Sequence, residues 1–93
     1  MSEVKDNPAA SRFEVTGGDA VAFVEYTRAG DRIALTHTEV PEALSGQGVG
    51  SKLVRGTLDA LRGSGVKVAP RCGFVAAYIE RHPEYRDLLD DRG

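Results

Sequence analysis

The residues of this chain that are best suited to chemistry form a short glycine-rich segment, Leu44–Lys52. Glycines occupy every second position in its centre, at Gly46, Gly48 and Gly50. Glycine lets a ligand approach the backbone closely because it has no Cβ. The segment leads directly into a predicted amphipathic helix, Ser51 to about Arg62, and the first-turn N–H groups of a helix bind phosphate or pyrophosphate. The segment therefore indicates a phosphate-binding loop, although a tight strand-to-helix turn would explain the same glycines.

Two better-known phosphate loops do not match this segment. A Walker loop has four residues between its first glycine and a Gly-Lys-Ser/Thr triplet, whereas only three separate Gly46 from Gly50, and Ser51 precedes Lys52. A Rossmann fingerprint reads G-x-G-x-x-G and opens a large parallel domain. Here the pattern is G-x-G-x-G, and only 43 of the 93 residues follow Gly50. Neither fold is compatible with this chain.

Composition limits the class of protein and its partners. A chain of 93 residues with 41% hydrophobic content forms one small domain with a lean core. Its net charge of −2 argues against a nucleic-acid partner. The chain has no apolar run long enough to span a membrane and no secretory signal. The single cysteine, Cys72, cannot form an internal disulfide. We therefore expect a cytoplasmic protein without membrane contact, present as a monomer or weak homodimer.

Alternation of polar and apolar residues, interrupted by turn signals, predicts three strands in an antiparallel meander. They cover Arg12–Thr16, Ala20–Thr27 and Arg32–Val40. The residues before them, 1–10, are polar and show no periodicity, so we expect a flexible tail ahead of a single domain over residues 11–93.

The second half of the chain predicts a strand–helix–strand unit and a final helix. Val66–Ala69 is a short strand, expected to complete a right-handed parallel crossover, and Gly73 to about His82 is a helix. The fold class is therefore α+β (α/β), with the order β-β-β-α-β-α. One face of the helix after the glycines is apolar and is expected to pack on the sheet: Val49, Leu53, Val54, Thr57, Leu58 and Leu61.

With this order of elements, the glycine loop resembles motif A of the GNAT acetyltransferase superfamily, Arg/Gln-x-x-Gly-x-Gly/Ala between a strand and a helix. The pattern falls on Ser45, Gly48 and Gly50. The similarity extends over about Thr36–Leu89, and includes a Pro-x-Cys segment and a last helix that runs into His82-Pro83-Glu84-Tyr85. The chain as a whole is similar to the short, stand-alone GNAT-like proteins, which share a compact GNAT-like fold.

The resemblance implies acetyl-CoA or coenzyme A as the ligand. Backbone amides of Gln47–Gly50 would hold the pyrophosphate, and the pantetheine arm would pair with an exposed strand edge near Thr38–Val40. Ser45 replaces the usual Arg or Gln, which would weaken binding by ~1–2 kcal/mol if a charge-assisted bond is lost. The residues implied at this site are Thr38, Val40, Ser45, Gly46, Gln47, Gly48, Val49, Gly50, Ser51, Lys52 and Cys72.

Acetyl transfer from a thioester to an amine requires a proton for the departing thiolate. The family alignment places Ile79 where many members have a tyrosine acid, and Tyr78 lies about 100° around the helix. The same alignment places Cys72 beside the expected pantetheine. A helix N-terminus and the neighbouring Arg71 would lower the pKa of its thiol. Cys72 is therefore a candidate nucleophile or proton donor, or else a small buried residue, which is the commoner fate of a lone cysteine.

The incoming amine must also lose a proton, and two residues of the third predicted strand are candidates for this. His37 and Glu39 lie on one face of the strand, and histidine has an ordinary pKa of ~6.5. A solvated strand surface is the alternative interpretation.

These observations support three hypotheses. The chain is a small N-acetyltransferase whose acceptor amine belongs to a small molecule, a peptide or a protein. Alternatively, it is a coenzyme A-binding module without turnover, or a structural or interaction domain that keeps the loop only for folding. No metal site is expected.

Overall fold

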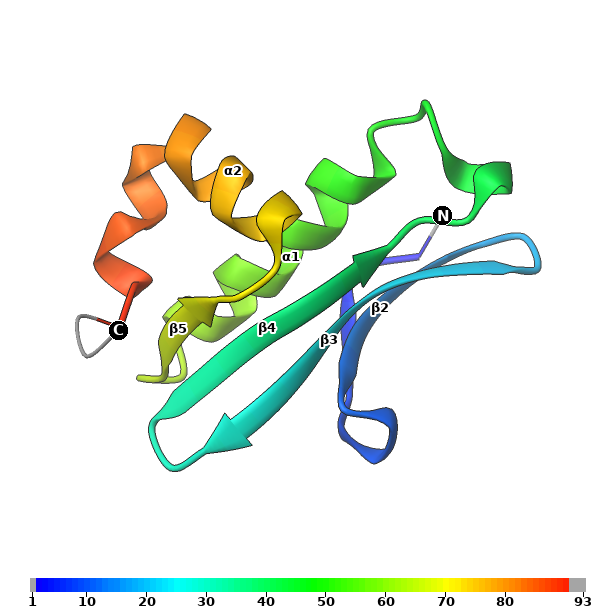
Figure 1. Cartoon of the computed structure of the whole chain (residues 1–93). Helices are drawn as coiled ribbons and strands as arrows, with labels where there is room; N and C mark the ends of the chain where they lie inside the picture. The colour runs from blue at the N-terminus through cyan, green and yellow to red at the C-terminus, as the bar shows by residue number, and fades with distance from the viewer. Residues whose placement is uncertain (1, 91–93) are drawn as a thin grey trace.

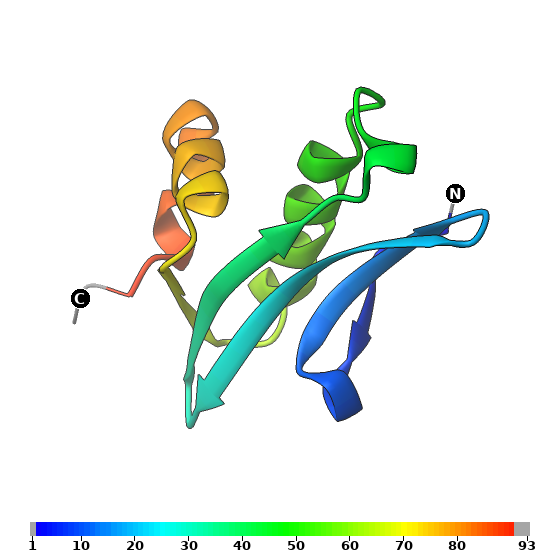
Figure 2. The ribbon, with the colours of Figure 1, turned by 45° about the vertical axis from the view of Figure 1, so that its right-hand side comes forward.

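A five-stranded mixed sheet forms one layer of the fold (Figures 1 and 2). The structure is a computed structural model that describes residues 2–90. The strands lie side by side in chain order, and all neighbours are antiparallel except β4 and β5, which are parallel. They are β1 (Lys5–Asn7), β2 (Arg12–Gly17), β3 (Ala20–Ala29), β4 (Arg32–Glu39) and β5 (Lys67–Pro70). The predicted α+β class, the antiparallel meander and the parallel strand pair are confirmed.

Apolar and polar residues alternate along the strands, and this alternation determines which face of the sheet is buried. In β2, Phe13 and Val15 are buried, whereas Arg12 and Glu14 are only partly covered. In β3 and β4 the same face carries Val24 and Leu35, both fully buried. The opposite face of β2–β4 is not covered by a helix in the described part of the chain (Figures 1 and 2).

The main helix, α1 (Val49–Arg62), packs against β2 and β3. It begins two residues before the predicted start at Ser51, because Gly48 adopts a left-handed conformation (φ 71°) that turns the chain directly into the helix. The predicted apolar face is confirmed, since the buried residues of α1 are Val49, Leu53, Val54, Thr57, Leu58 and Leu61.

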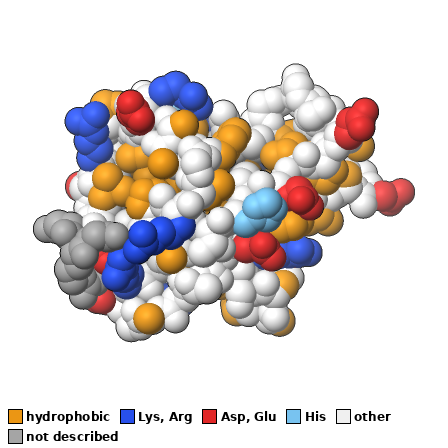
Figure 3. All heavy atoms as spheres, viewed as in Figure 1, with side chains coloured by type: hydrophobic (Ala, Val, Ile, Leu, Met, Phe, Trp, Pro, Cys, Tyr) orange, Lys and Arg blue, Asp and Glu red, His pale blue; other side chains and the backbone are white. Residues whose placement is uncertain are grey.

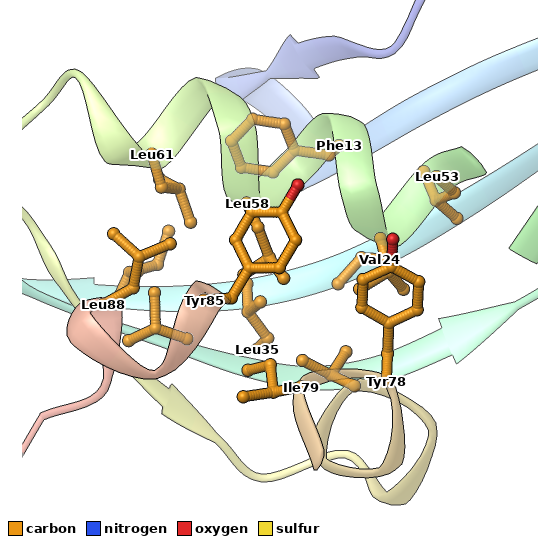
Figure 4. Packing of buried hydrophobic residues seen from close by; sticks show 14 of the residues in the cluster. Phe13, Val24, Leu35, Leu53, Leu58, Leu61, Tyr78, Ile79, Tyr85 and Leu88 are labelled. Atoms are coloured by element: carbon orange, nitrogen blue, oxygen red, sulfur yellow. The ribbon is translucent and has the colours of Figure 1, made fainter. Parts of the chain in front are cut away.

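The C-terminal segments pack beside α1 over the junction of β4 and β5. Helix α2 (Gly73–Arg81) is followed by a short 3-10 helix, Pro83–Leu88. Tyr85 in this segment donates a hydrogen bond to Asp59 of α1 at 2.6 Å. Figure 4 shows its ring with Leu88, and with Tyr78 and Ile79 of α2, in the same cluster as residues of α1 and of the sheet. The core therefore fixes the position of α2 relative to α1.

A flexible tail was expected over residues 1–10, and for residues 2–10 the structure differs from this expectation. Lys5–Asn7 forms β1, which pairs with β2, and Val4 lies against Gly56 of α1. The Lys52 ammonium group donates a hydrogen bond to the carbonyl oxygen of Ser2 at 3.0 Å. This short segment carries no periodicity signal because backbone pairing and the single apolar contact of Val4 hold it, rather than a repeating apolar face.

The strands β4 and β5 separate before β4 ends, and this separation positions the candidate site. Their pairing runs only from Arg32 to Leu35 on β4. The backbone amides of Arg71 and Cys72 then both donate to the carbonyl oxygen of Leu35, each at 3.0 Å. The rest of β4 pairs with β3 alone among the described strands, through a bulge opposite Glu25.

None of the helices within residues 2–90 is long and apolar enough to cross a membrane.

The contact between Val4 and Gly56 gives a stability prediction. Alanine in a helix interior ordinarily stabilises by about 1 kcal/mol relative to glycine. At position 56, however, a Cβ would lie 2.5 Å from Val4 Cγ2. We expect Gly56→Ala to lower the free energy of unfolding by about 1 kcal/mol, measured by urea denaturation. In a Val4→Gly background, which also removes the Val4 Cβ that would lie 2.7 Å away, the same substitution should be neutral or stabilising. A Gly56→Ala protein more stable than wild type would contradict this packing.

Candidate functional site

A pocket of about 280 Å³ lies at the N-terminal end of α1. The glycine loop forms one side of it, and the end of β4 and the first turn of α2 form the other. Its lining residues are Val40, Leu44, Ser45, Gly46, Gly48, Val49, Gly50, Ser51 and Phe74. The structure thus brings most of the residues predicted to bind the ligand to one place.

The loop and the first turn of α1 leave backbone amides at the edge of this pocket without an acceptor in the helix. Gly46 and Gly48 both have left-handed φ angles, 77° and 71°, which glycine adopts without strain. The Lys52 amide donates to the Gly48 carbonyl oxygen at 3.0 Å and closes the first turn of α1. The amides of Val49–Ser51 precede this bond and so have no intrahelical acceptor, and no side chain caps the helix. With the helix dipole behind them, these N–H groups can bind an anion.

Three predicted ligand residues have side chains that bond elsewhere. Ser45 lines the pocket, but its hydroxyl donates to the Glu42 carbonyl oxygen at 2.9 Å. The Gln47 amide side chain donates to the Ala43 carbonyl oxygen at 3.3 Å, and Gln47 does not line the pocket. Lys52 lines a different pocket on α1 and bonds to the N-terminal segment. The loop therefore offers backbone donors rather than a charged side chain.

Cys72 stands at the start of α2, where β5 ends. Its sulfur lies 3.3 Å from the hydroxyl of Thr38 on β4. Partial burial raises the pKa of the Cys72 thiol, but the Thr38 hydroxyl and the nearby amides of Val75 and Phe74 favour the thiolate and leave the pKa below its ordinary value. The Cys72 sulfur forms no hydrogen bond that caps α2, so these amides favour the thiolate only by lying near the sulfur. The site therefore holds a thiol with increased thiolate character.

The two candidate bases lie on the other face of β4. Thr38 pairs with Val24 and faces the helices, so its neighbours His37 and Glu39 face the side that no described helix covers. Their side chains are 55% and 58% exposed, and His37 Nε2 lies 3.6 Å from Glu39 Oε1. On this face, Figure 3 shows acidic side chains gathered around a histidine near the end of β4. The structure thus brings the two candidate bases together but does not bring them to the face that carries Cys72.

Neither residue near the expected acid position is exposed. Ile79 and Tyr78 are each only 3% exposed and belong to the core (Figure 4). The Tyr78 ring stacks on His82 with centroids 4.1 Å apart, and burial raises the pKa of its hydroxyl. Both residues therefore serve packing in this structure.

The sequence analysis missed Phe74, which lines the pocket. Its side chain is 42% exposed, unusual for a large apolar residue in this chain. The buried residues of α2 are Val75, Tyr78 and Ile79, so Phe74 lies outside the stripe that packs on the core. An aromatic residue off the buried face, two positions after Cys72, was the signal available in the sequence.

The Thr38–Cys72 contact gives a prediction about pH dependence. Replacing Thr38 by valine removes a hydrogen bond that favours the thiolate, so the pKa of Cys72 should rise. Alkylation by iodoacetamide near neutral pH should then slow severalfold, with the rate–pH profile displaced to higher pH. Cys72 is the only cysteine, so the reaction reports on it alone.

Thr36→Val is the matched control for this experiment. The Thr36 hydroxyl lies on the same strand but donates to the Glu25 carbonyl oxygen at 3.2 Å. Its alkylation profile should coincide with that of wild type. An unchanged profile in Thr38→Val would contradict the proposed influence of the hydroxyl on the thiol.

Comparisons with known proteins agree with this geometry. Protein NATD1 from Gallus gallus and from Mus musculus is 35% identical to this chain over 65 residues. The match covers 69% of the chain and 57% of each relative, so the chain spans little more than half their length. The solution structure of a GCN5-like protein from Staphylococcus aureus superposes with a TM-score of 0.72 at 27% identity, and covers 97% of this chain and 91% of that one.

The sequence profile of the family described as GCN5-related N-acetyl-transferase matches residues 12–88, nearly the whole described chain. The chain therefore belongs to the GCN5-related N-acetyltransferase family.

Proposed function

We propose that this protein binds acetyl-CoA and transfers its acetyl group to an amine, with residues 11–93 acting as one acetyltransferase domain. The observation that carries the proposal is the pocket between the α1 N-terminus and the first turn of α2. It joins unused backbone amides, which suit a diphosphate, to the region of Thr38 and Cys72, where a thioester can react.

The diphosphate and the pantetheine arm of the ligand would each meet a suitable part of the pocket, in the order in which they follow one another in the ligand. The diphosphate would lie against the amides of Gly48–Ser51, as at other helix N-termini that bind phosphate. The pantetheine arm would then pass Val40 and Phe74, which line the far side of the pocket. Beyond Leu35, β4 pairs with β3 alone among the described strands, so its free edge can bond the amides of that arm.

Cys72 supplies a nucleophile for a two-step route. Its thiolate attacks the thioester carbonyl carbon, the bond from that carbon to the coenzyme A sulfur breaks, and coenzyme A leaves as a thiolate that takes up a proton from water. The amine then attacks the acetyl-cysteine, the new C–N bond forms, and Cys72 leaves as a thiolate. The Thr38 hydroxyl stabilises this thiolate in both steps. The route needs a reduced thiol, which suits a cytoplasmic location.

The acceptor amine would approach from the face of β4 that no described helix covers. His37 and Glu39 lie on this face at the free end of the strand. Either can take the proton that the amine loses, while Cys72 acts from the helix side. The amine nitrogen must still reach the acetyl carbon on Cys72, so it would react at the free edge of β4, where the two faces meet.

A second function, coenzyme A binding without turnover, is favoured by one observation. Ile79 occupies the position where many relatives carry a tyrosine acid, and both Ile79 and Tyr78 are buried. If Cys72 supplies no replacement, the pocket would bind the ligand but not release a protonated thiol. Acetylation of the protein itself separates the two functions.

Gly48 tests whether the loop binds the ligand. The left-handed φ of 71° at position 48 would strain an alanine and disturb the amides at the start of α1. The added Cβ itself would have open space, since nothing lies within 4 Å of it. We expect Gly48→Ala to weaken coenzyme A binding at least tenfold in isothermal titration. Gly30→Ala is the matched control, since Gly30 also has a positive φ (60°) and an open surrounding, but lies in the β3–β4 turn. An equal loss of affinity in both variants, or no loss in either, would show that the ligand does not bind at the loop.

A further prediction concerns turnover. Intact-mass spectrometry after mixing with acetyl-CoA should show one added acetyl group, absent in Cys72→Ala, and hydroxylamine should remove it as expected of a thioester. If Cys72→Ala transfers acetyl to an amine panel at the wild-type rate, the cysteine has no covalent role. Binding without any acetyl transfer would favour the non-catalytic module.

A further inference from the structure

The exposure of Phe74 alone does not identify a role, because single exposed apolar residues are common. Its position is more informative. Phe74 belongs to the first turn of α2, two residues after Cys72, and lines the same pocket as Gly48 and Gly50. The ring therefore lies beside the amides that suit a diphosphate, on the same helix turn that follows the thiol of Cys72.

Gly50 is the partner of this ring. Unlike Gly46 and Gly48, it has no positive φ, so the backbone does not require glycine here. Inside a helix, glycine destabilises by about 1 kcal/mol relative to alanine. A Cβ at this position would lie 2.7 Å from Phe74 Cζ and 3.4 Å from both Cε atoms. Glycine at position 50 thus provides the space in which the ring edge rests on α1.

The wall that results is apolar. Val40, Leu44 and Val49 line the pocket with Phe74, whereas its polar groups are backbone amides and two serine hydroxyls. Leu44 and Val49 are already buried in the core, so a nucleotide diphosphate alone would use the amides and leave Phe74 and the partly buried Val40 in water. A ligand that continues as a long, weakly polar arm would cover these two side chains and gain hydrophobic free energy.

Resting on the proposed function, we propose that Phe74, seated on Gly50, is the residue that selects coenzyme A and its thioesters over other nucleotide diphosphates. The ring contacts the pantetheine arm and guides it from the diphosphate toward Cys72. Phe74 acts by contact with the arm, and takes no part in proton or acetyl transfer.

Isothermal titration with coenzyme A and with ADP, which has the diphosphate but not the arm, tests this proposal. Phe74→Ala should weaken coenzyme A binding about tenfold and leave ADP binding unchanged, as expected for the loss of one aromatic contact. Phe74→Leu, which keeps an apolar wall, should recover most of the coenzyme A affinity. Equal losses for both ligands would show that Phe74 only supports the loop and would overturn the proposal, as would no loss for either.

Gly50→Ala provides an independent variant that should fold, because alanine suits a helix. The added methyl group displaces the ring, so this substitution should weaken coenzyme A binding in the wild-type background but have little further effect in Phe74→Ala. Additive losses would contradict a shared role. If wild-type protein binds no coenzyme A while Phe74→Ala folds normally, the proposed function itself fails, and this selectivity fails with it.

Discussion

The carbonyl oxygen of Leu35, which accepts hydrogen bonds from the amides of both Arg71 and Cys72, ends the pairing of the two parallel strands. Because β5 stops there, β4 continues with one edge free and α2 begins beside it. The start of α2 then faces the start of α1 across a pocket. One strand separation therefore provides the edge, the thiol and the space that the proposed chemistry needs.

The core fixes the start of α1 relative to the start of α2. One cluster contains the fully buried Leu53 and Leu58 of α1 and Val75 of α2. The 3-10 helix Pro83–Leu88 packs on α1 through Tyr85, whose ring lies in this cluster (Figure 4). Leu44 and Val49 belong both to this core and to the wall of the pocket. Gly46, Gly48 and Phe74 contribute little to the core, because the two glycines have no side chain and adopt left-handed conformations, and Phe74 is exposed.

Periodicity and turn signals were sufficient to predict the meander and the whole buried face of α1, because each of these buries an apolar pattern of regular spacing. The parallel pair was predicted from the order strand–helix–strand, which favours a crossover connection. Periodicity did not predict β1, whose residues Lys5–Asn7 are polar and held by backbone pairing. The glycine spacing predicted the loop, but not that Lys52 would turn to the N-terminal segment. The contact of Thr38 with Cys72 depends on the bulge in β4, and the seat of Phe74 on Gly50 joins residues far apart in sequence. Neither follows from local pattern.

In the proposed function, the amides at the start of α1 hold the diphosphate of the ligand. The most direct measurement is an NMR titration of ¹⁵N-labelled protein with coenzyme A, followed through its backbone amide signals. The account predicts that the largest shifts fall on Gly48–Ser51, with Cys72 and Phe74 also affected. Saturable shifts confined to the pocket around Lys52 and Arg55, or to the uncovered face of the sheet, would contradict it.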